Sequence, residues 1–255
     1  MLTTFESIVI VLLIVTGSLG FLVLLRRIWP SEQRHGQNDL IGWQVSVLGT
    51  AYAVIMGFML FAVWTNYENA DNNAEAEANS LINVVRSAQG LPAGPRGQIG
   101  DLARKYVNVI LTEEWPAMGH LRFSPESARL TEQLWSTVLT AEAHSSSEQT
   151  SLDHTLNELS ELTEHRRMRQ LQSNSHMPGI LWAVLTIGAV LTIVSACLFG
   201  GVDFKLHLIQ VFILSLMLSL VLVAIADINR PFQGSVHIDP VGFERARVTL
   251  NDQSR

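Results

Sequence analysis

The residues best suited to bind a metal ion form one short series in the second half of the chain. Two histidines and two glutamates follow one another at spacings of four, three and four residues: His154, Glu158, Glu161 and His165. These spacings place the four side chains on one face of a helix, and imidazole with carboxylate suits a transition metal. A solvated helix surface gives the same pattern, and helical metal sites usually draw ligands from several helices. We therefore predict no metal or other cofactor and keep this face as a weak candidate.

The other notable charged residues are acidic or basic clusters without a catalytic pattern. Glu75 and Glu77 follow a long apolar segment, where carboxylates from several assembled copies could form an acidic ring at a pore mouth. In an ordinary solvated helix the same two residues would only face water. Glu113-Glu-Trp115 is an acidic and aromatic group, most simply a packed tryptophan with solvated neighbours. The basic cluster His165–Arg169 can contact anionic lipid headgroups or pair with acidic residues of its own domain.

Motifs of the common enzyme classes are absent from the sequence. It contains no nucleophile elbow, phosphate-binding glycine loop, zinc signature or kinase-like set. The single cysteine, Cys197, lies in an apolar run and cannot form an intrachain disulfide. The net charge of −6 falls on residues 66–178, so no basic face suggests a nucleic-acid partner. We predict that the chain is not an enzyme and does not bind nucleic acid.

Four long apolar segments indicate an integral membrane protein. The chain is 48% hydrophobic and only 16% charged, and a bilayer core needs about 20 apolar residues in a helix. The segments that meet this length are about 5–25, 40–64, 179–198 and 206–226. The first has no basic residue before it and no small-residue cleavage site after it, so it is a retained span rather than a signal peptide.

The second apolar segment differs from the other three in its small and polar residues. Gly49, Ala53 and Gly57 recur every four residues and allow close approach of another helix. Ser46, Thr50 and Tyr52 add hydroxyl groups to the same span. Trp43 and Trp64 bracket it as interfacial aromatic residues. We predict that these six small and polar residues line a pore if the chain forms a channel.

The predicted fold class is all-α, with two transmembrane pairs flanking a soluble helical domain. The predicted regions are 1–65, the soluble domain 66–178, 179–226 and a C-terminal tail 227–255. Residues 66–88 form either a separate helix or a continuation of the second span. Further helices are expected at about 98–115, from 125 to near 145, and at 148–172, because Pro and Gly clusters or serine runs separate these segments.

Motifs spread along the chain resemble the bestrophin-like domain family. The matching segments are Asn38-Asp-Leu-Ile-Gly42, Gly49-Thr-Ala-Tyr-Ala-Val54, Ala62-Val-Trp64, Glu113-Glu-Trp-Pro116, His165-Arg-Arg167, Pro178-Gly-Ile-Leu-Trp182 and Asp227-Ile-Asn-Arg-Pro-Phe-Gln-Gly234. The resemblance covers about residues 34–243. The family is in turn distantly similar to bestrophins, pentameric anion channels whose second span lines the pore and whose helical domain is cytosolic.

The resemblance implies an oligomeric ion channel in the cell membrane, with lipid, further copies of the chain and a permeant ion as partners. Gln233 interrupts the proline-phenylalanine-glycine segment typical of bestrophins, and the second span lacks their isoleucine-proline-x-x-phenylalanine pattern. A clustered acidic calcium site is not recognisable in the sequence. The resemblance therefore assigns neither anion selectivity nor calcium gating.

Membrane orientation is nearly balanced by the positive-inside rule. Arg26, Arg27 and Arg34 favour a cytoplasmic position for the first short loop, whereas arginines near the other span ends favour the opposite. The resemblance favours a cytoplasmic soluble domain. A membrane-anchored interaction or sensor protein, whose acidic helical domain binds a partner, is the alternative to a channel. A helical metalloenzyme based on the His154–His165 face is a third hypothesis.

Overall fold

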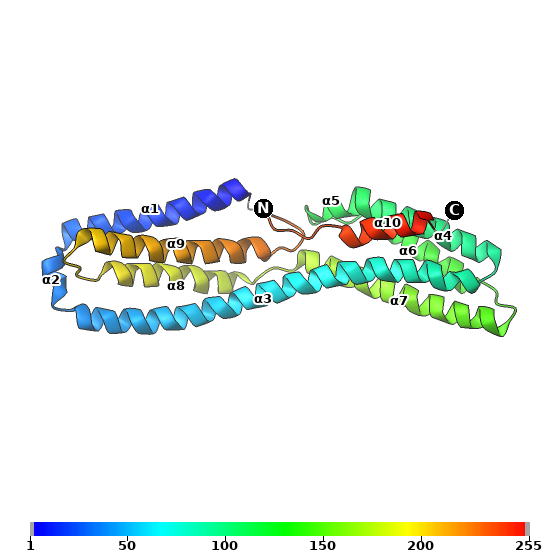
Figure 1. Ribbon diagram of the computed structural model, residues 1–255, viewed down its shortest axis with the longest axis horizontal. Helices are drawn as coiled ribbons and strands as arrows, with labels where there is room; N and C mark the ends of the chain where they lie inside the picture. Colours follow the sequence, from blue (N-terminus) through cyan, green and yellow to red (C-terminus); the bar gives the residue numbers. More distant parts are fainter. Residues whose placement is uncertain (1–2, 253–255) are drawn as a thin grey trace. The chain divides into compact units, whose positions relative to one another are not determined.

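The computed structural model describes residues 3–252, and helices and loops make up this entire range (Figure 1). The helices divide into two compact units. One, the four-span unit, comprises residues up to Thr65 together with His176–Asn229 and Gly234–Val236. The other, the polar unit, comprises Asn66–Ser175, Arg230–Gln233 and residues from His237 onward.

The four-span unit contains four helices long and apolar enough to cross a membrane. They are α1 (Thr4–Ile28), the first part of α3 (Asn38–Ser87), α8 (Gly179–Cys197) and α9 (Phe204–Ile228). A short helix, α2 (Ser31–His35), connects α1 to α3. The predicted fold class is thereby confirmed. Since peptide groups in hydrocarbon must bond to one another, each long apolar segment forms a complete helix.

Local signals set the ends of these helices. Thr3 and Glu6 form a reciprocal capping box at the start of α1. Pro178, which cannot continue a preceding helix, stands immediately before α8. The Asp203 carboxylate accepts hydrogen bonds from the backbone N–H groups of Lys205 and Leu206 and so caps α9.

Helix α3 answers a question that the sequence left open. Residues 66–87 continue the second span as one uninterrupted helix of 50 residues. Its first part presents a single buried stripe, Ile41, Tyr52, Met56 and Val63, to the four-span unit. A smaller share of this span is buried than of any other span in the described chain. Most of its surface is therefore left uncovered by its own chain.

The polar unit is built from the second part of α3 and a series of shorter helices. These are η1 (Ala88–Gly90), α4 (Ala93–Val109), the π-helical turn η2 (Ile110–Glu114), α5 (Trp115–Met118), α6 (Pro125–Leu139), α7 (Ser146–Asn174) and α10 (Val241–Asp252). Helix α4 begins earlier than the predicted start at Gln98, because Pro95 falls in its first turn, where proline is tolerated. Ser124 and Ser145 cap α6 and α7.

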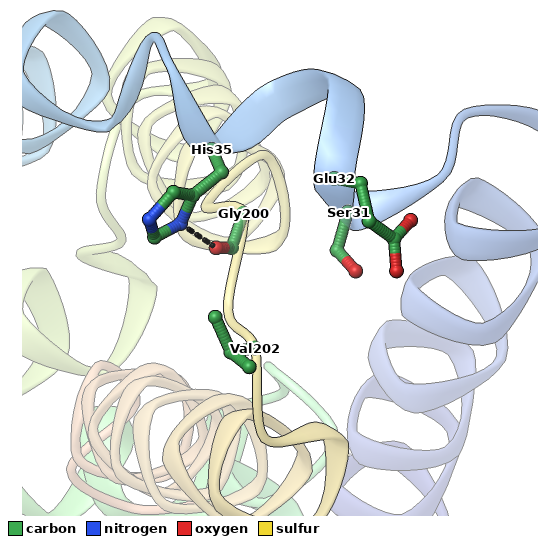
Figure 2. Close-up of a pocket in the computed structure, with 5 residues that line it drawn as sticks. All are labelled: Ser31, Glu32, His35, Gly200 and Val202. Atoms are coloured by element: carbon green, nitrogen blue, oxygen red, sulfur yellow. Dashed lines mark hydrogen bonds between the residues drawn. The ribbon is translucent and has the colours of Figure 1, made fainter.

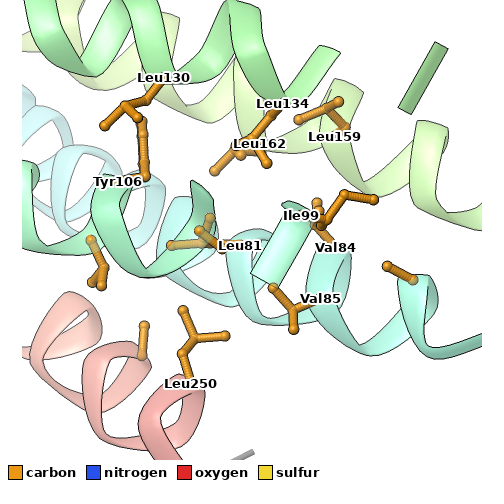
Figure 3. Close-up of a cluster of buried hydrophobic side chains, with 14 of the residues drawn as sticks. Leu81, Val84, Val85, Ile99, Tyr106, Leu130, Leu134, Leu159, Leu162 and Leu250 are labelled. Carbon is orange, nitrogen blue, oxygen red and sulfur yellow. The ribbon is translucent and has the colours of Figure 1, made fainter. Parts of the chain in front are cut away.

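An apolar core fills the polar unit, and the residues labelled in Figure 3 come from α3, α4, α6, α7 and α10. Helix α3 supplies Leu81, Val84 and Val85, and the other helices supply Ile99, Tyr106, Leu130, Leu134, Leu159, Leu162 and Leu250. All ten are at most 4% exposed. The same helix that is sparsely covered in the four-span unit is thus a central core element here.

Candidate functional site

The small and polar residues of the second span lie together on one face of α3. Ser46, Thr50, Ala53 and Gly57 follow at spacings of four, three and four, which keeps them in line along a helix. All four are exposed, and Gly49 beside them is half-buried. A Cβ atom added at Gly49 or Gly57 would meet no atom within 4 Å. We call these five residues the small-residue face; nothing in the described chain covers it.

One hydroxyl on this face has no hydrogen-bond partner in the part of the chain that the structure describes. Ser46 Oγ donates a hydrogen bond to the Gly42 carbonyl at 2.8 Å, and Thr186 on α8 likewise donates to the Trp182 carbonyl at 2.8 Å. Such back-bonding is the usual way to satisfy a hydroxyl within a membrane helix. The Thr50 hydroxyl makes no such bond to any residue between 3 and 252. It is therefore free to bind water, an ion or a neighbouring subunit.

Tyr52, predicted to line a pore with these residues, instead faces the interior of its own chain. Its side chain is 3% exposed, and its hydroxyl donates a 2.7 Å hydrogen bond to the Leu185 carbonyl of α8. Its ring lies against Gly188, where an added Cβ would come within 2.4 Å of a ring carbon. Tyr52 belongs to the buried stripe because it is two residues from Thr50, about 200° around the helix. Its role is to fix α3 against α8.

A third face of α3 carries large apolar side chains. Trp43, Val47, Val54, Phe58 and Phe61 are all more than half exposed. Lipid or a neighbouring subunit can cover such a face, whereas the small-residue face offers far less apolar area. Helix α3 therefore has three faces. One packs against its own chain, one is the large apolar face, and one is the small-residue face.

Glu77, predicted at a pore mouth, is fully buried inside the polar unit. Arg169 of α7 donates to both of its carboxylate oxygens, from Nε at 2.6 Å and from Nη2 at 3.0 Å. The Tyr106 hydroxyl of α4 donates a further 2.6 Å bond to the same carboxylate. Because all three side chains are completely buried, Glu77 holds the helices of this unit together and cannot contact a permeant ion.

Glu75, its predicted companion, lies near the surface of the polar unit. Its carboxylate pairs with the exposed guanidinium of Arg245 on α10. Gly242 lies close enough that an added Cβ would sit 3.0 Å from the Glu75 carboxyl carbon. The two predicted acidic residues therefore have different surroundings, and both already have a cationic partner in the same chain.

A second carboxylate completes the buried charge network. Arg169 Nη2 donates to Glu114 Oε1 at 2.8 Å, Arg166 lies 3.9 Å from the other Glu114 oxygen, and the Ser127 hydroxyl also donates to Glu114. Burial alone would raise the pKa of Glu114, but Arg169, the Ser127 bond and Arg166 outweigh it and lower that pKa. Burial would likewise lower the pKa of Arg169, but the charge of Glu77 leads the effects that raise it. Both groups are charged at neutral pH.

The π-helical turn η2 positions Glu114 for this network. Such single turns are rare and re-aim the side chains that follow them. Here Glu114 is buried, whereas Glu113, its neighbour, is exposed and accepts a 2.9 Å bond from Ser124 Oγ. Of the two alternatives that the sequence left open for the basic cluster His165–Arg169, its Arg166 and Arg169 pair with acidic residues of their own domain.

The four residues of the weak metal candidate serve as contacts between helices or face solvent. His165 Nδ1 lies 3.1 Å from Asn73 Oδ1 of α3, and Glu158 accepts a 3.2 Å bond from Asn83 of the same helix. Glu161 is 3.6 Å from His165 Nε2, and His154 is exposed. Within residues 3–252, no three histidine, cysteine or acidic side chains are grouped to hold a metal ion.

The segment after α9 makes a tight turn that the sequence marked by its motif. Gly234 has a φ of +91°, a conformation that favours glycine. An added Cβ would lie 2.5 Å from Asp227 Oδ1, and that oxygen accepts a 3.0 Å bond from the Ser235 backbone N–H. Two other residues of this segment contact Trp115. The Ile238 carbonyl accepts a 3.3 Å hydrogen bond from Trp115 Nε1, and the Phe232 ring packs edge-on against the Trp115 ring.

These features define an all-helical membrane protein with a long second span that its own chain leaves largely uncovered. Residues 12–243 match the sequence profile of the bestrophin-like domain, so the chain belongs to the bestrophin-like domain family. No curated protein matches the sequence.

Solved structures with the same fold come from a bacterial bestrophin homolog of Klebsiella pneumoniae. A crystal structure solved by Zn-SAD phasing is 15% identical, with a TM-score of 0.70 over 97% of this chain and 98% of that one. A single-residue variant of the homolog is 17% identical, with a TM-score of 0.71 over 98% and 99%. At these identities the likeness establishes the fold over nearly the whole chain.

Proposed function

We propose that this chain is one subunit of an oligomeric, multi-pass ion channel in the cell membrane. Membership of the bestrophin-like family and the shared fold of the bestrophin homolog support this proposal. The function is transport through a protein pore rather than catalysis. A pentamer is the expected assembly if the resemblance to bestrophins extends to subunit number, and the polar unit then lies in the cytoplasm.

The conduction path in this proposal is lined by the small-residue face of α3. The observation that carries it is the combination of exposure and polarity: the face is uncovered, and the Thr50 hydroxyl has no partner within residues 3–252. A hydroxyl left without a partner in hydrocarbon is unfavourable, whereas water or an ion in a pore satisfies it. The large apolar face, with Val54, Phe58 and Phe61, is then available to lipid or to the adjacent subunit.

One subunit supplies only one such face, so the proposal requires several copies around an axis. Tyr52 supports the arrangement by fixing α3 to α8 through its bond to Leu185. Glu75 and Glu77 have no pore-lining role in this version, since each is paired within the polar unit.

Two measurements on the purified protein test the proposal. Native mass spectrometry in mild detergent gives the subunit number, and ion flux from reconstituted liposomes gives conduction. We expect an oligomer that passes ions and a changed conductance in Thr50→Val, which removes the unpartnered hydroxyl while keeping the side-chain volume. Thr186→Val is the matched control, because Thr186 is also exposed but already bonds to its own helix.

A monomer without ion flux would overturn the channel proposal and favour the membrane-anchored sensor. An oligomeric channel in which both threonine variants behave alike would keep the function but reject the assignment of the small-residue face.

A further inference from the structure

Two arginines come together where the short loops of the four-span unit meet, and no carboxylate accompanies them. Arg34 of α2 is 1% exposed, and Arg26 near the end of α1 is close enough to interact with it electrostatically. Within residues 3–252, no acidic side chain lies within 4.0 Å of either guanidinium, although seven other arginine–carboxylate pairs meet this limit. This positive charge is therefore not balanced by a neighbouring side chain.

The hydrogen bonds of the two guanidinium groups are incomplete. Arg34 Nη1 donates to the Cys197 carbonyl at 2.8 Å, at the C-terminal end of α8. Arg34 Nε and Arg26 Nη1 are shielded from solvent and have no hydrogen-bond partner in the described chain. The Phe204 ring, 4.6 Å from Arg26 Cζ, gives only a cation–π contact. Buried charged donors are costly unless an acceptor meets them, so these two N–H groups are suited to an acceptor from outside the chain.

An apolar groove in the four-span unit lies close to Arg34. Its apolar lining includes Val45, Phe199, Val211 and Leu214, and its polar lining is His207 and Gln210. His207 is within electrostatic range of both arginines. His207 Nε2 is 3.1 Å from the Ala196 carbonyl, one residue before the carbonyl that Arg34 bonds. Ala196 and His207, which line the groove, therefore lie next to the carbonyl that Arg34 bonds, and an apolar groove beside a cationic group suits a phospholipid.

A second pocket, between α2 and the loop that joins α8 to α9, is less suitable for an anion. It is lined by Ser31, Glu32, His35, Gly200 and Val202, and His35 Nδ1 lies 3.0 Å from the Gly200 carbonyl (Figure 2). The carboxylate of Glu32 lies at this pocket and repels anions. The groove beside His207 is therefore the better approach to the arginines.

We propose that Arg26 and Arg34 bind the phosphate of an anionic phospholipid whose acyl chain lies in the groove lined by Val45, Phe199, Val211 and Leu214. The phosphate oxygens accept the hydrogen bonds that Arg34 Nε and Arg26 Nη1 leave unused, and their charge balances the buried Arg34 and the half-buried Arg26. Guanidinium groups suit this recognition because their donors match phosphate geometry. The site is independent of ion conduction.

The test measures lipid binding to the purified protein in mild detergent. Dioleoyl-phosphatidylglycerol is titrated, with dioleoyl-phosphatidylcholine and inorganic phosphate as separate arms, and bound lipid is counted by native mass spectrometry. We expect saturable binding of phosphatidylglycerol that Arg26→Gln weakens about tenfold or more, as expected for a lost charge-assisted hydrogen bond. Arg27→Gln is the matched control, because Arg27 is adjacent and equally charged but exposed.

Each outcome decides the proposal. Phosphatidylglycerol binding that is weakened only by the Arg26 change supports a lipid site. Binding of inorganic phosphate with the same dependence, without lipid binding, overturns the lipid proposal and makes a free anion the ligand of the arginines. Equal binding of both lipids, or equal losses in Arg26→Gln and Arg27→Gln, overturns it. Arg34→Gln is a second variant, and the half-buried Arg26 keeps the test decisive if the Arg34 variant does not fold.

Discussion

Two arginines buried to the same degree have opposite surroundings in the two units. Arg169 in the polar unit is 0% exposed and Arg34 in the four-span unit is 1% exposed. Arg169 bonds the carboxylates of Glu77 and Glu114, at 2.6 and 2.8 Å. Arg34 bonds one backbone carbonyl, and its Nε has no hydrogen-bond partner among residues 3–252. Burial alone therefore does not determine which groups balance the charge of an arginine.

The difference reflects what each unit packs against. In the polar unit, carboxylates from α3 and η2 converge on Arg169 of α7, so the chain supplies its own counter-charges. At the short-loop end of the four-span unit, the negative C-terminal end of α8 gives Arg34 partial compensation. The rest of the balance comes from outside the chain, which is the basis for the phospholipid proposal.

We expect the largest loss of unfolding free energy when Arg169 is replaced. Arg169→Met leaves Glu77 and Glu114 buried without their shared cation, and breaking a buried pair in this way costs about 3–5 kcal/mol. Chemical denaturation of the purified protein in mild detergent measures this loss in unfolding free energy. Arg167→Met is the control, because Arg167 and its partner Glu164 are exposed, and we expect little change. Equal stability of the two variants would contradict the role given to Arg169.

A smaller loss is expected where α3 packs on α8. Gly188→Ala places a Cβ about where the Tyr52 ring now lies, and forcing extra atoms into a packed contact costs about 1–3 kcal/mol. Gly20→Ala, where an added Cβ meets nothing within 4 Å, serves as the control for the loss of a glycine. Denaturation curves that shift equally for both variants would show that Tyr52 does not fix this contact.

Arg34→Met tests directly whether the loss of Arg34 costs less stability than the loss of Arg169. In lipid-free detergent we expect a loss of about 1–2 kcal/mol, because one charge-assisted hydrogen bond disappears and no carboxylate is left unpaired. Added phosphatidylglycerol should stabilise the wild type and leave the variant unchanged. A loss as large as that of Arg169→Met, measured without lipid, would mean that the two arginines are equivalent after all.

The smallest effect concerns pH. The folded-state pKa of Glu114 lies below its ordinary value of 4.5, so its ionisation stabilises the folded state at higher pH. This contribution is lost as the pH falls from about 4.5 through the lower folded-state pKa. Glu114→Gln should therefore flatten the acid side of the stability–pH curve, measured by thermal unfolding. An unchanged acid slope in the variant would exclude Glu114 as its source.

The spans could be predicted from the sequence because apolar length is a local property. The faces of α3 were only partly predictable. Spacing places Ser46, Thr50, Ala53 and Gly57 in line, and the same reasoning applied to Tyr52 would have separated it from them. The burial of Glu77 could not be predicted, since its partner Arg169 lies 92 residues away and an alanine- and glutamate-rich helix usually faces water. Nor does any local signal reveal the π-helical turn that re-aims Glu114.

The most direct test of the central claim is water accessibility along α3 in a conducting assembly. The native cysteine, Cys197, is buried, so single cysteines can be introduced into the otherwise unchanged chain. A charged, water-soluble thiol reagent should alter ion flux through Thr50→Cys liposomes and leave Phe58→Cys, on the large apolar face, unaffected. An effect at Phe58 without one at Thr50 would contradict the proposal that the small-residue face lines the path.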